Sequence, residues 1–192
     1  IVVGIERDTS LTAMAHLTCV GHRRDDITSL LAEYEEGGVS NILALAGDPP
    51  AGGPVEGDFT YALELVELVR SAGDFSIGVA AHPEGHPRSP DRDADLRHLA
   101  AKLRAADFGV TQFFFRADDY LRLRDGLAAL GCTTPVIPGI MPVTNAGQVQ
   151  RFAELSGAAF PADLAARLDA VSDDPAAVRA IGVEVATELC RH

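Results

Sequence analysis

The stretch Asn41–Asp48, NILALAGD, is a short apolar run that ends in a glycine and a carboxylate. Its apolar residues are nearly continuous rather than alternating, which is typical of a parallel strand covered on both faces. Four more runs of this kind occur, separated by amphipathic segments, at a spacing of about thirty residues, the size of one βα unit. The predicted strands are Thr12–Val20, Asn41–Ala46, Ser76–His82, Gly109–Phe115 and Pro135–Met141.

The segments between these strands have the apolar spacing of helices, and most of them end at a glycine. The predicted helices are Arg24–Glu36, Phe59–Ser71, Asp91–Ala106, Asp118–Leu130, Ala146–Ser156, Pro161–Val171 and Pro175–Cys190. Residues Ile1–Asp8 look like the end of a further helix. Because the chain opens without a methionine and His192 still lies in a helical pattern, we expect a piece of a longer protein.

Polar, glycine or proline residues stand at the carboxyl end of all five predicted strands. A doubly wound sheet gathers its ligand groups at one switch point, whereas every strand of a TIM barrel contributes to a common face. The sequence therefore favours α/β architecture of the TIM (β/α)8 type, with residues 1–192 as a single partial barrel domain. A full barrel would need about two more strands before this chain and one after it.

Composition excludes several classes of partner. The 192 residues carry a net charge of −12, which would repel nucleic acid and anionic membranes. No apolar stretch reaches the ~18 residues of a membrane span. The three cysteines, Cys19, Cys132 and Cys190, are widely spaced and match no metal pattern, so we expect thiols in a reducing cytoplasm.

Several strand ends carry candidate ligand groups. Gly47 would let a flat ligand approach the backbone beside Asp48, although Asp48 could instead cap its own turn. His82 and His86 lie four residues apart, but the prolines around them predict a loop, so we expect a polar loop that lines a cofactor rather than a metal site. Gln112 interrupts the run Val110–Phe115, where an amide buried beside aromatic rings needs hydrogen-bond partners.

Two helices carry candidates with a simpler alternative. Asp95, His98 and Lys102 form one polar stripe, which could equally be a solvated helix face. Phe152 lies on an amphipathic helix, where a core position is the default and stacking on a ligand the alternative. No phosphate-binding glycine loop, nucleophile motif or Cys/His cluster is present in the sequence, so the residues alone indicate a large ligand without naming it.

Five segments, in order along nearly the whole chain, resemble the methylenetetrahydrofolate reductase family. They are His16–Val20 (HLTCV), Leu43–Pro50 (LALAGDPP), Val79–Pro87 (VAAHPEGHP), Val110–Phe115 (VTQFFF) and Ile137–Pro142 (IPGIMP). The resemblance implies a flavin-containing TIM barrel in which NADH or NADPH reduces FAD. The reduced FAD then converts 5,10-methylenetetrahydrofolate to 5-methyltetrahydrofolate, in one-carbon and methionine metabolism. It also implies a homo-oligomer.

The resemblance assigns roles to individual residues. The implied FAD contacts are His16, Gly47, Asp48, Tyr61, Ala62, His82, His86, Asp95, His98 and Lys102. Asp48 would face both the flavin and the folate pterin as the electrostatic catalytic group. Gln112 would bind pterin and nicotinamide, Gln148 would bind folate, and Phe152 would stack on both substrates in turn.

The sequence departs from the family in two respects. Ala46 stands where the family usually has an arginine. The family's general-acid glutamate belongs to a strand that this chain does not contain. Two rival functions therefore remain: a non-flavin TIM-barrel enzyme, which the absence of a strand lysine disfavours, and a degenerate barrel that acts as a binding domain.

Overall fold

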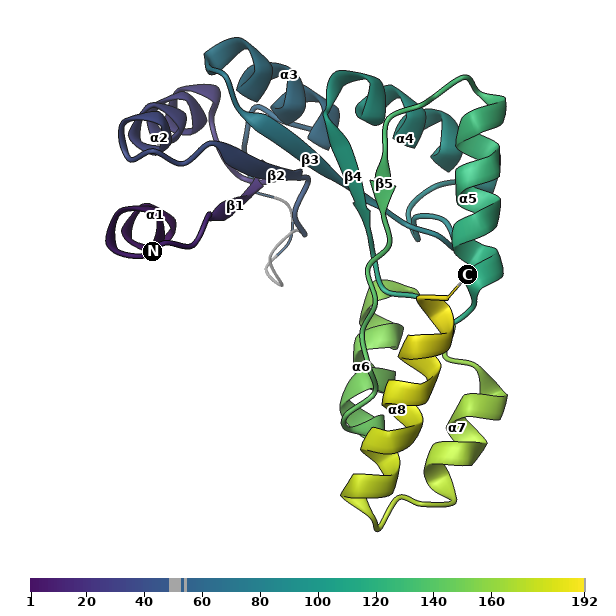
Figure 1. The fold of residues 1–192 in the computed structure, drawn as a ribbon. Coiled ribbons are helices and arrows are strands. Elements are labelled where there is room, and N and C mark those ends of the chain that lie inside the picture. The colour runs from purple at the N-terminus through teal and green to yellow at the C-terminus, as the bar shows by residue number, and fades with distance from the viewer. Residues whose placement is uncertain (49–52, 54, 192) are drawn as a thin grey trace. The chain divides into compact units, whose positions relative to one another are not determined.

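The computed structural model describes residues 1–48, 53 and 55–191 (Figure 1). Its centre is a five-stranded sheet with the sequential order β1-β2-β3-β4-β5, and β1, β2 and β3 pair in parallel. Because the order never reverses among these strands, the sheet lacks the switch point that defines a doubly wound fold. The strands are β1 (Met14–Thr18), β2 (Asn41–Leu45), β3 (Ser76–Ala81), β4 (Phe108–Thr111) and β5 (Val136–Ile137).

Helices follow the strands as the sequence predicts. Two of them, the helices at 24–36 and 146–156, have the predicted bounds to the residue. Every helix in the described ranges is too short or too polar to cross a bilayer. The helices are α1 (Val2–Asp8), α2 (Arg24–Glu36), α3 (Ala62–Ala72), α4 (Arg92–Ala105), α5 (Ala117–Ala129), α6 (Ala146–Ser156), α7 (Ala162–Asp169) and α8 (Pro175–Leu189).

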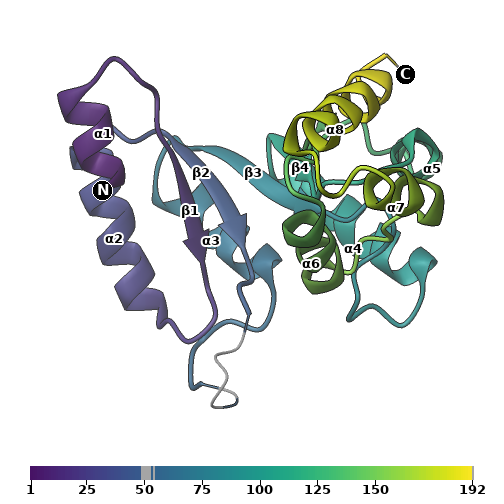
Figure 2. The same ribbon diagram turned by 90° about the horizontal axis from the view of Figure 1, so that it is seen from below.

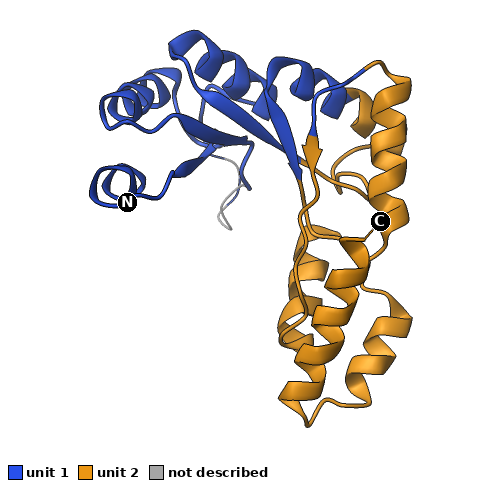
Figure 3. Cartoon of the chain, viewed as in Figure 1, with its two compact units in different colours: residues 1–80, 98–110, 132–135 blue, residues 81–97, 111–131, 136–192 orange. Residues whose placement is uncertain are grey.

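The chain divides into two compact units, which Figure 3 colours separately. Unit 1 comprises Ile1–Ala80, His98–Val110 and Cys132–Pro135, and unit 2 comprises the remainder, Ala81–Arg97, Thr111–Gly131 and Val136–His192. The prediction of a single barrel domain stays a prediction.

Unit 1 packs α2 and α3 along β1, β2 and β3 (Figures 1 and 2). The parallel register places Ala15, Ile42 and Ile77 on one face of these strands, and all three are fully buried. On the other face of β1, Met14 and His16 are exposed. The prediction that each strand is covered on both faces is therefore wrong for β1, because it is an edge strand whose buried residues alternate with exposed ones.

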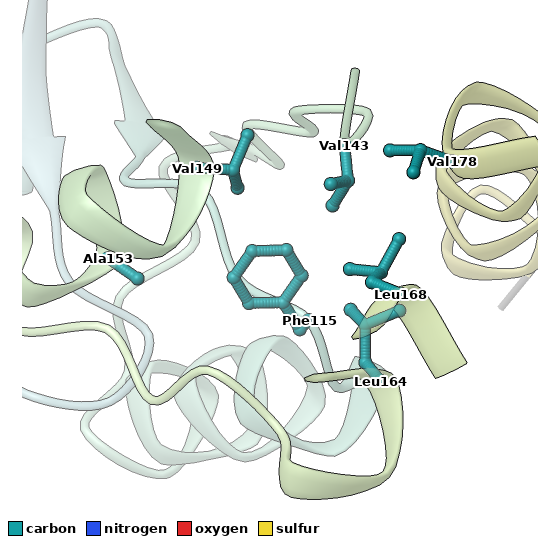
Figure 4. Packing of buried hydrophobic residues seen from close by; sticks show 7 residues of the cluster. All are labelled: Phe115, Val143, Val149, Ala153, Leu164, Leu168 and Val178. Atoms are coloured by element: carbon teal, nitrogen blue, oxygen red, sulfur yellow. The ribbon is translucent and has the colours of Figure 1, made fainter. Parts of the chain in front are cut away.

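Unit 2 has a helical core that α6, α7 and α8 build around Phe115 (Figure 4). The Phe115 and Phe160 rings meet edge to face, with centroids 5.0 Å apart. At Gly182 the backbone of α8 lies against the main chain of Val143, and an added Cβ would overlap the Val143 carbonyl. The buried members are Phe115, Val143, Val149, Ala153, Leu164, Leu168 and Val178.

Three predicted strands are clearly too long, and the one expected at Thr12–Val20 spans only Met14–Thr18. The strand expected at Gly109–Phe115 ends at Thr111, because the three phenylalanines leave the sheet and Phe115 enters the helical core of unit 2. The strand expected at Pro135–Met141 keeps only Val136–Ile137, since proline at 138 cannot donate to a strand ladder.

Candidate functional site

The described end of the β2 loop, in unit 1, depends on glycine. Gly47 has φ +82°, and an added Cβ would lie 2.7 Å from Val20 Cγ1 and 3.0 Å from Thr18 Cβ. Only glycine combines this backbone conformation with this close approach. Asp48 follows with an exposed side chain. Pro49 and Pro50 of the motif lie outside the described residues, and so does the turn of the capping alternative for Asp48.

His16 is the candidate residue of β1, and it is exposed. Its register partner on the neighbouring strand β2 is Leu43. Beyond this strand the buried thiol of Cys19 lies 3.6 Å from the Ala46 carbonyl oxygen and 4.0 Å from that of Tyr61. Burial raises the pKa of the Cys19 thiol, so it stays protonated and serves packing. The prediction of buried free thiols is confirmed for Cys19 and Cys132, whereas Cys190 is exposed.

Tyr61 and Ala62 stand at the amino end of α3. The Tyr61 side chain is exposed and Ala62 is buried, so Ala62 offers a ligand little surface. The carboxylate of Glu64 accepts the N–H groups of Thr60 and Tyr61 at 2.6 and 2.7 Å. These hydrogen bonds lower the pKa of Glu64, and the one from Tyr61 has the larger effect. They also explain why the helix starts at Ala62 rather than at the predicted Phe59.

The loop after β3, in unit 2, brings two histidines together. His82 and His86 are half-buried, and their rings meet edge to face with centroids 4.5 Å apart. The segment forms a loop, as its prolines predict. A helix is not needed to bring His82 and His86 together, because a turn from His82 to Gly85 does so. Within the described residues, no three His, Cys, Asp or Glu side chains gather closely enough to hold a metal ion.

Hydrogen bonds within the loop and from other segments hold it in place. The guanidinium of Arg92 donates to the Pro83 carbonyl oxygen at 3.0 Å, and His86 Nδ1 accepts the Arg88 N–H at 3.1 Å. Glu84 accepts the N–H of Ala159 with both carboxylate oxygens, each at 3.0 Å. Burial raises the pKa of Glu84, and the bond from Ala159 acts against that rise. Glu84 lies in a family-like segment but is not among the candidate residues that the sequence indicates.

The stripe on α4 is less uniform than a solvated face. The carboxylate of Asp95 is half-buried and accepts the Ser89 hydroxyl at 3.0 Å. The ammonium of Lys102 is also on a half-buried residue and donates to the Ala80 carbonyl oxygen, at the end of β3, at 3.0 Å. Only His98 is exposed as the solvated alternative requires. Two of the three residues are thus fixed side chains.

Gln112 follows the last residue of β4 and is half-buried, so the expectation of a buried amide is wrong. Its side chain is less enclosed than we expect for a strand residue because the strand has ended at Thr111. Its backbone N–H donates to the Ala81 carbonyl oxygen at 2.8 Å, which fixes it at the carboxyl end of the sheet.

Helix α6 separates its buried residues from its candidate ligand residues. Val149 and Ala153 point into the core of unit 2 (Figure 4). Gln148 and Phe152, each one position earlier and four residues apart, are exposed, with 41% of Phe152 accessible. The core position that was the default for Phe152 is therefore wrong, because the adjacent pair supplies the buried face.

Comparison with known proteins gives the family. The sequence profile described as methylenetetrahydrofolate reductase matches residues 1–192. The chain is 38% identical to the 5,10-methylenetetrahydrofolate reductase of Escherichia coli, over all of this chain and 64% of that protein. It is 39% identical to methylenetetrahydrofolate reductase 2 of Saccharomyces cerevisiae, over 94% of this chain and 32% of that protein. The chain belongs to the methylenetetrahydrofolate reductase family.

A solved structure supports the fold. It is titled an uncharacterized protein from Clostridium thermocellum that binds two copies of 5-methyl-5,6,7,8-tetrahydrofolic acid. The match covers 96% of this chain and 62% of that one, with a TM-score of 0.59 and 14% identity. This chain therefore shares its α/β arrangement, and spans less than two thirds of the length of both the bacterial relative and this neighbour.

Proposed function

We propose that the protein is an FAD-dependent methylenetetrahydrofolate reductase that uses NADH or NADPH. The observation that supports this most directly is the family match over the whole chain, together with the strand-end positions of the candidate residues. We further propose that the sheet is part of a TIM barrel in a cytoplasmic homo-oligomer.

The residues present fit a flavin. Gly47 lets the backbone pass close to Thr18 and Val20, and the Asp48 side chain that follows it is exposed. Lys102 carries a cation that the Ala80 carbonyl holds in place, and an ammonium is a suitable partner for a phosphate. Bound FAD supplies hydride transfer between the nicotinamide and the folate.

The protein's own residues bind and orient the substrates. The Asp48 carboxylate would stabilise positive charge that develops on the folate as its five-membered ring opens. Gln112 and Gln148 each offer an amide donor and acceptor, which suits the edge of a pterin. The exposed ring of Phe152 can stack on one flat substrate and then on the other. A structural neighbour that binds a methylated tetrahydrofolate is consistent with this ligand class.

The test begins with the absorbance spectrum of the purified intact protein. We expect flavin bands that bleach when NADH or NADPH is added without oxygen and that return when methylenetetrahydrofolate follows. A colourless protein that takes up no FAD would exclude the proposed function and favour a non-flavin barrel or a binding domain. Bleaching without recovery would retain the flavin and exclude the folate substrate.

A further inference from the structure

Unit 2 contains a carboxylate to which the proposed function gives no role. Glu84 lies in the middle of the loop between β3 and α4, and both of its oxygens are 3.0 Å from the Ala159 nitrogen. Ala159 belongs to the segment between α6 and α7, 75 residues further along the chain. A hydrogen bond to an ionised carboxylate is stronger than one between neutral groups.

A second contact joins the same two segments. Gly157 ends α6 with φ +74°, and an added Cβ would lie 2.7 Å from Cγ of Pro87, in the loop after β3. The end of α6 therefore packs directly against this loop. Gly157 and Pro87 are each within a few residues of the hydrogen bond between Glu84 and Ala159 in the sequence. Both contacts lie within unit 2.

The charges around Glu84 come from neighbouring elements. Arg92 at the start of α4, and Asp119 and Arg122 on α5, act on the carboxylate through space. Arg122 is paired with Asp119, and Arg92 donates to the Pro83 carbonyl. Because these cations have other partners, the direct hydrogen bond of Glu84 goes to the Ala159 amide.

We propose that Glu84 is a positioning residue that fixes the carboxyl end of α6 on the loop after β3. This helix carries Gln148 and Phe152, and the loop carries His82 and His86. The bond thereby sets the substrate-binding face of α6 against the loop assigned to the flavin. This role rests on the proposed function and assigns to Glu84 no contact with the reacting atoms.

The test compares two substitutions at one position in the intact protein. Glu84→Ala removes the acceptor, and we expect the KM for methylenetetrahydrofolate to rise about tenfold. We expect kcat, flavin content and the rate of flavin reduction to change less than about twofold, because Arg92 still holds the loop. Glu84→Gln keeps one acceptor oxygen for the amide and should restore KM to within about threefold of wild type.

The matched control is Asp163→Ala. Asp163 is an exposed carboxylate of unit 2 that binds Arg116 at 3.0 Å and touches neither segment of the proposed contact. An increase in KM equal to that of Glu84→Ala would overturn the proposal. So would a kcat that falls far more than about twofold in both Glu84→Ala and Glu84→Gln, since this would indicate proton transfer rather than positioning.

A glycine pair covers the case in which Glu84→Ala fails to fold. Gly157→Ala places a Cβ against Pro87, whereas Gly131→Ala adds the same kind of backbone strain at φ +68° in open space. We expect only the first to raise KM for the folate, and equal effects would refute the positioning role. Hydrogen exchange of the Ala159 amide, faster in Glu84→Ala than in Glu84→Gln, reports the bond independently of catalysis. A wild-type protein without flavin would instead refute the proposed function, whatever the exchange rates.

Discussion

The described part of the loop after β2 takes its shape from the backbone of one glycine, whereas the loop after β3 is held by side chains. Gly47 alone turns the chain so that Asp48 becomes exposed. Around His82 and His86, by contrast, Arg92 and Glu84 connect the loop to other segments. The first arrangement suits a group that meets substrates in turn, and the second suits residues that hold one ligand throughout the cycle.

The largest expected effect tests the exposed carboxylate. Asp48→Asn keeps the shape of the side chain and removes its charge, so we expect the reduction of methylenetetrahydrofolate to slow about 100-fold. Reduction of the flavin by NADH should slow less than about threefold, because that step develops no positive charge on folate. Stopped-flow measurement of each half-reaction decides the matter, and equal slowing of both would remove the proposed role of Asp48.

The next effect tests the glycine that exposes Asp48. Gly47→Ala meets Val20 and Thr18, while Gly38→Ala, at φ +79° in the same unit, meets only Glu6 Cγ at 3.8 Å. We expect Gly47→Ala to lower the free energy of unfolding by about 1–2 kcal/mol more than Gly38→Ala does. Urea titration of both variants measures this difference. If the two variants are equally destabilised, the backbone strain at positive φ, rather than the close approach to Val20 and Thr18, explains the glycine at position 47.

The smallest effect concerns the cation at the end of β3. Lys102→Met removes the ammonium that donates to Ala80 and keeps a similar stem, so we expect FAD to dissociate about fivefold more readily. Lys102→Arg retains the charge and should lose less affinity. Titration of the apo-protein with FAD compares them. Unchanged affinity in Lys102→Met would exclude Lys102 from the FAD site.

The spacing of apolar residues predicted the helices well where the burial of one helix face determines the structure. The helices at 24–36 and 146–156 were predicted to the residue, because their apolar spacing and terminal glycines agree. The strand at 108–111 was overextended, since a run of phenylalanines reads as strand although Phe115 packs among helices. The default for Phe152 failed because helical spacing alone does not show whether the face of Val149 and Ala153 or the neighbouring face of Phe152 is buried.

Contacts between distant segments could not be predicted from the sequence. Glu84 and Ala159 are 75 residues apart, and although Glu84 stands in a family-like segment, nothing in the sequence points to Ala159 as its partner. The proximity of His82 and His86 also depends on a turn whose geometry the prolines allow but do not specify. Position in the sequence marked Asp48, Gln112 and the stripe on α4 as candidates, and the resemblance to a family assigned their roles, which stay predictions.

The contact between Gly182 and the Val143 main chain has a consequence for engineering. Replacing a helical glycine with alanine is a common way to raise thermal stability, worth about 0.4–1 kcal/mol where the site is compatible. In α8 the added methyl group would overlap a backbone carbonyl that cannot rotate away. Any library designed to make this protein more heat-resistant should therefore leave position 182 unchanged and seek its gains at helix positions that face solvent.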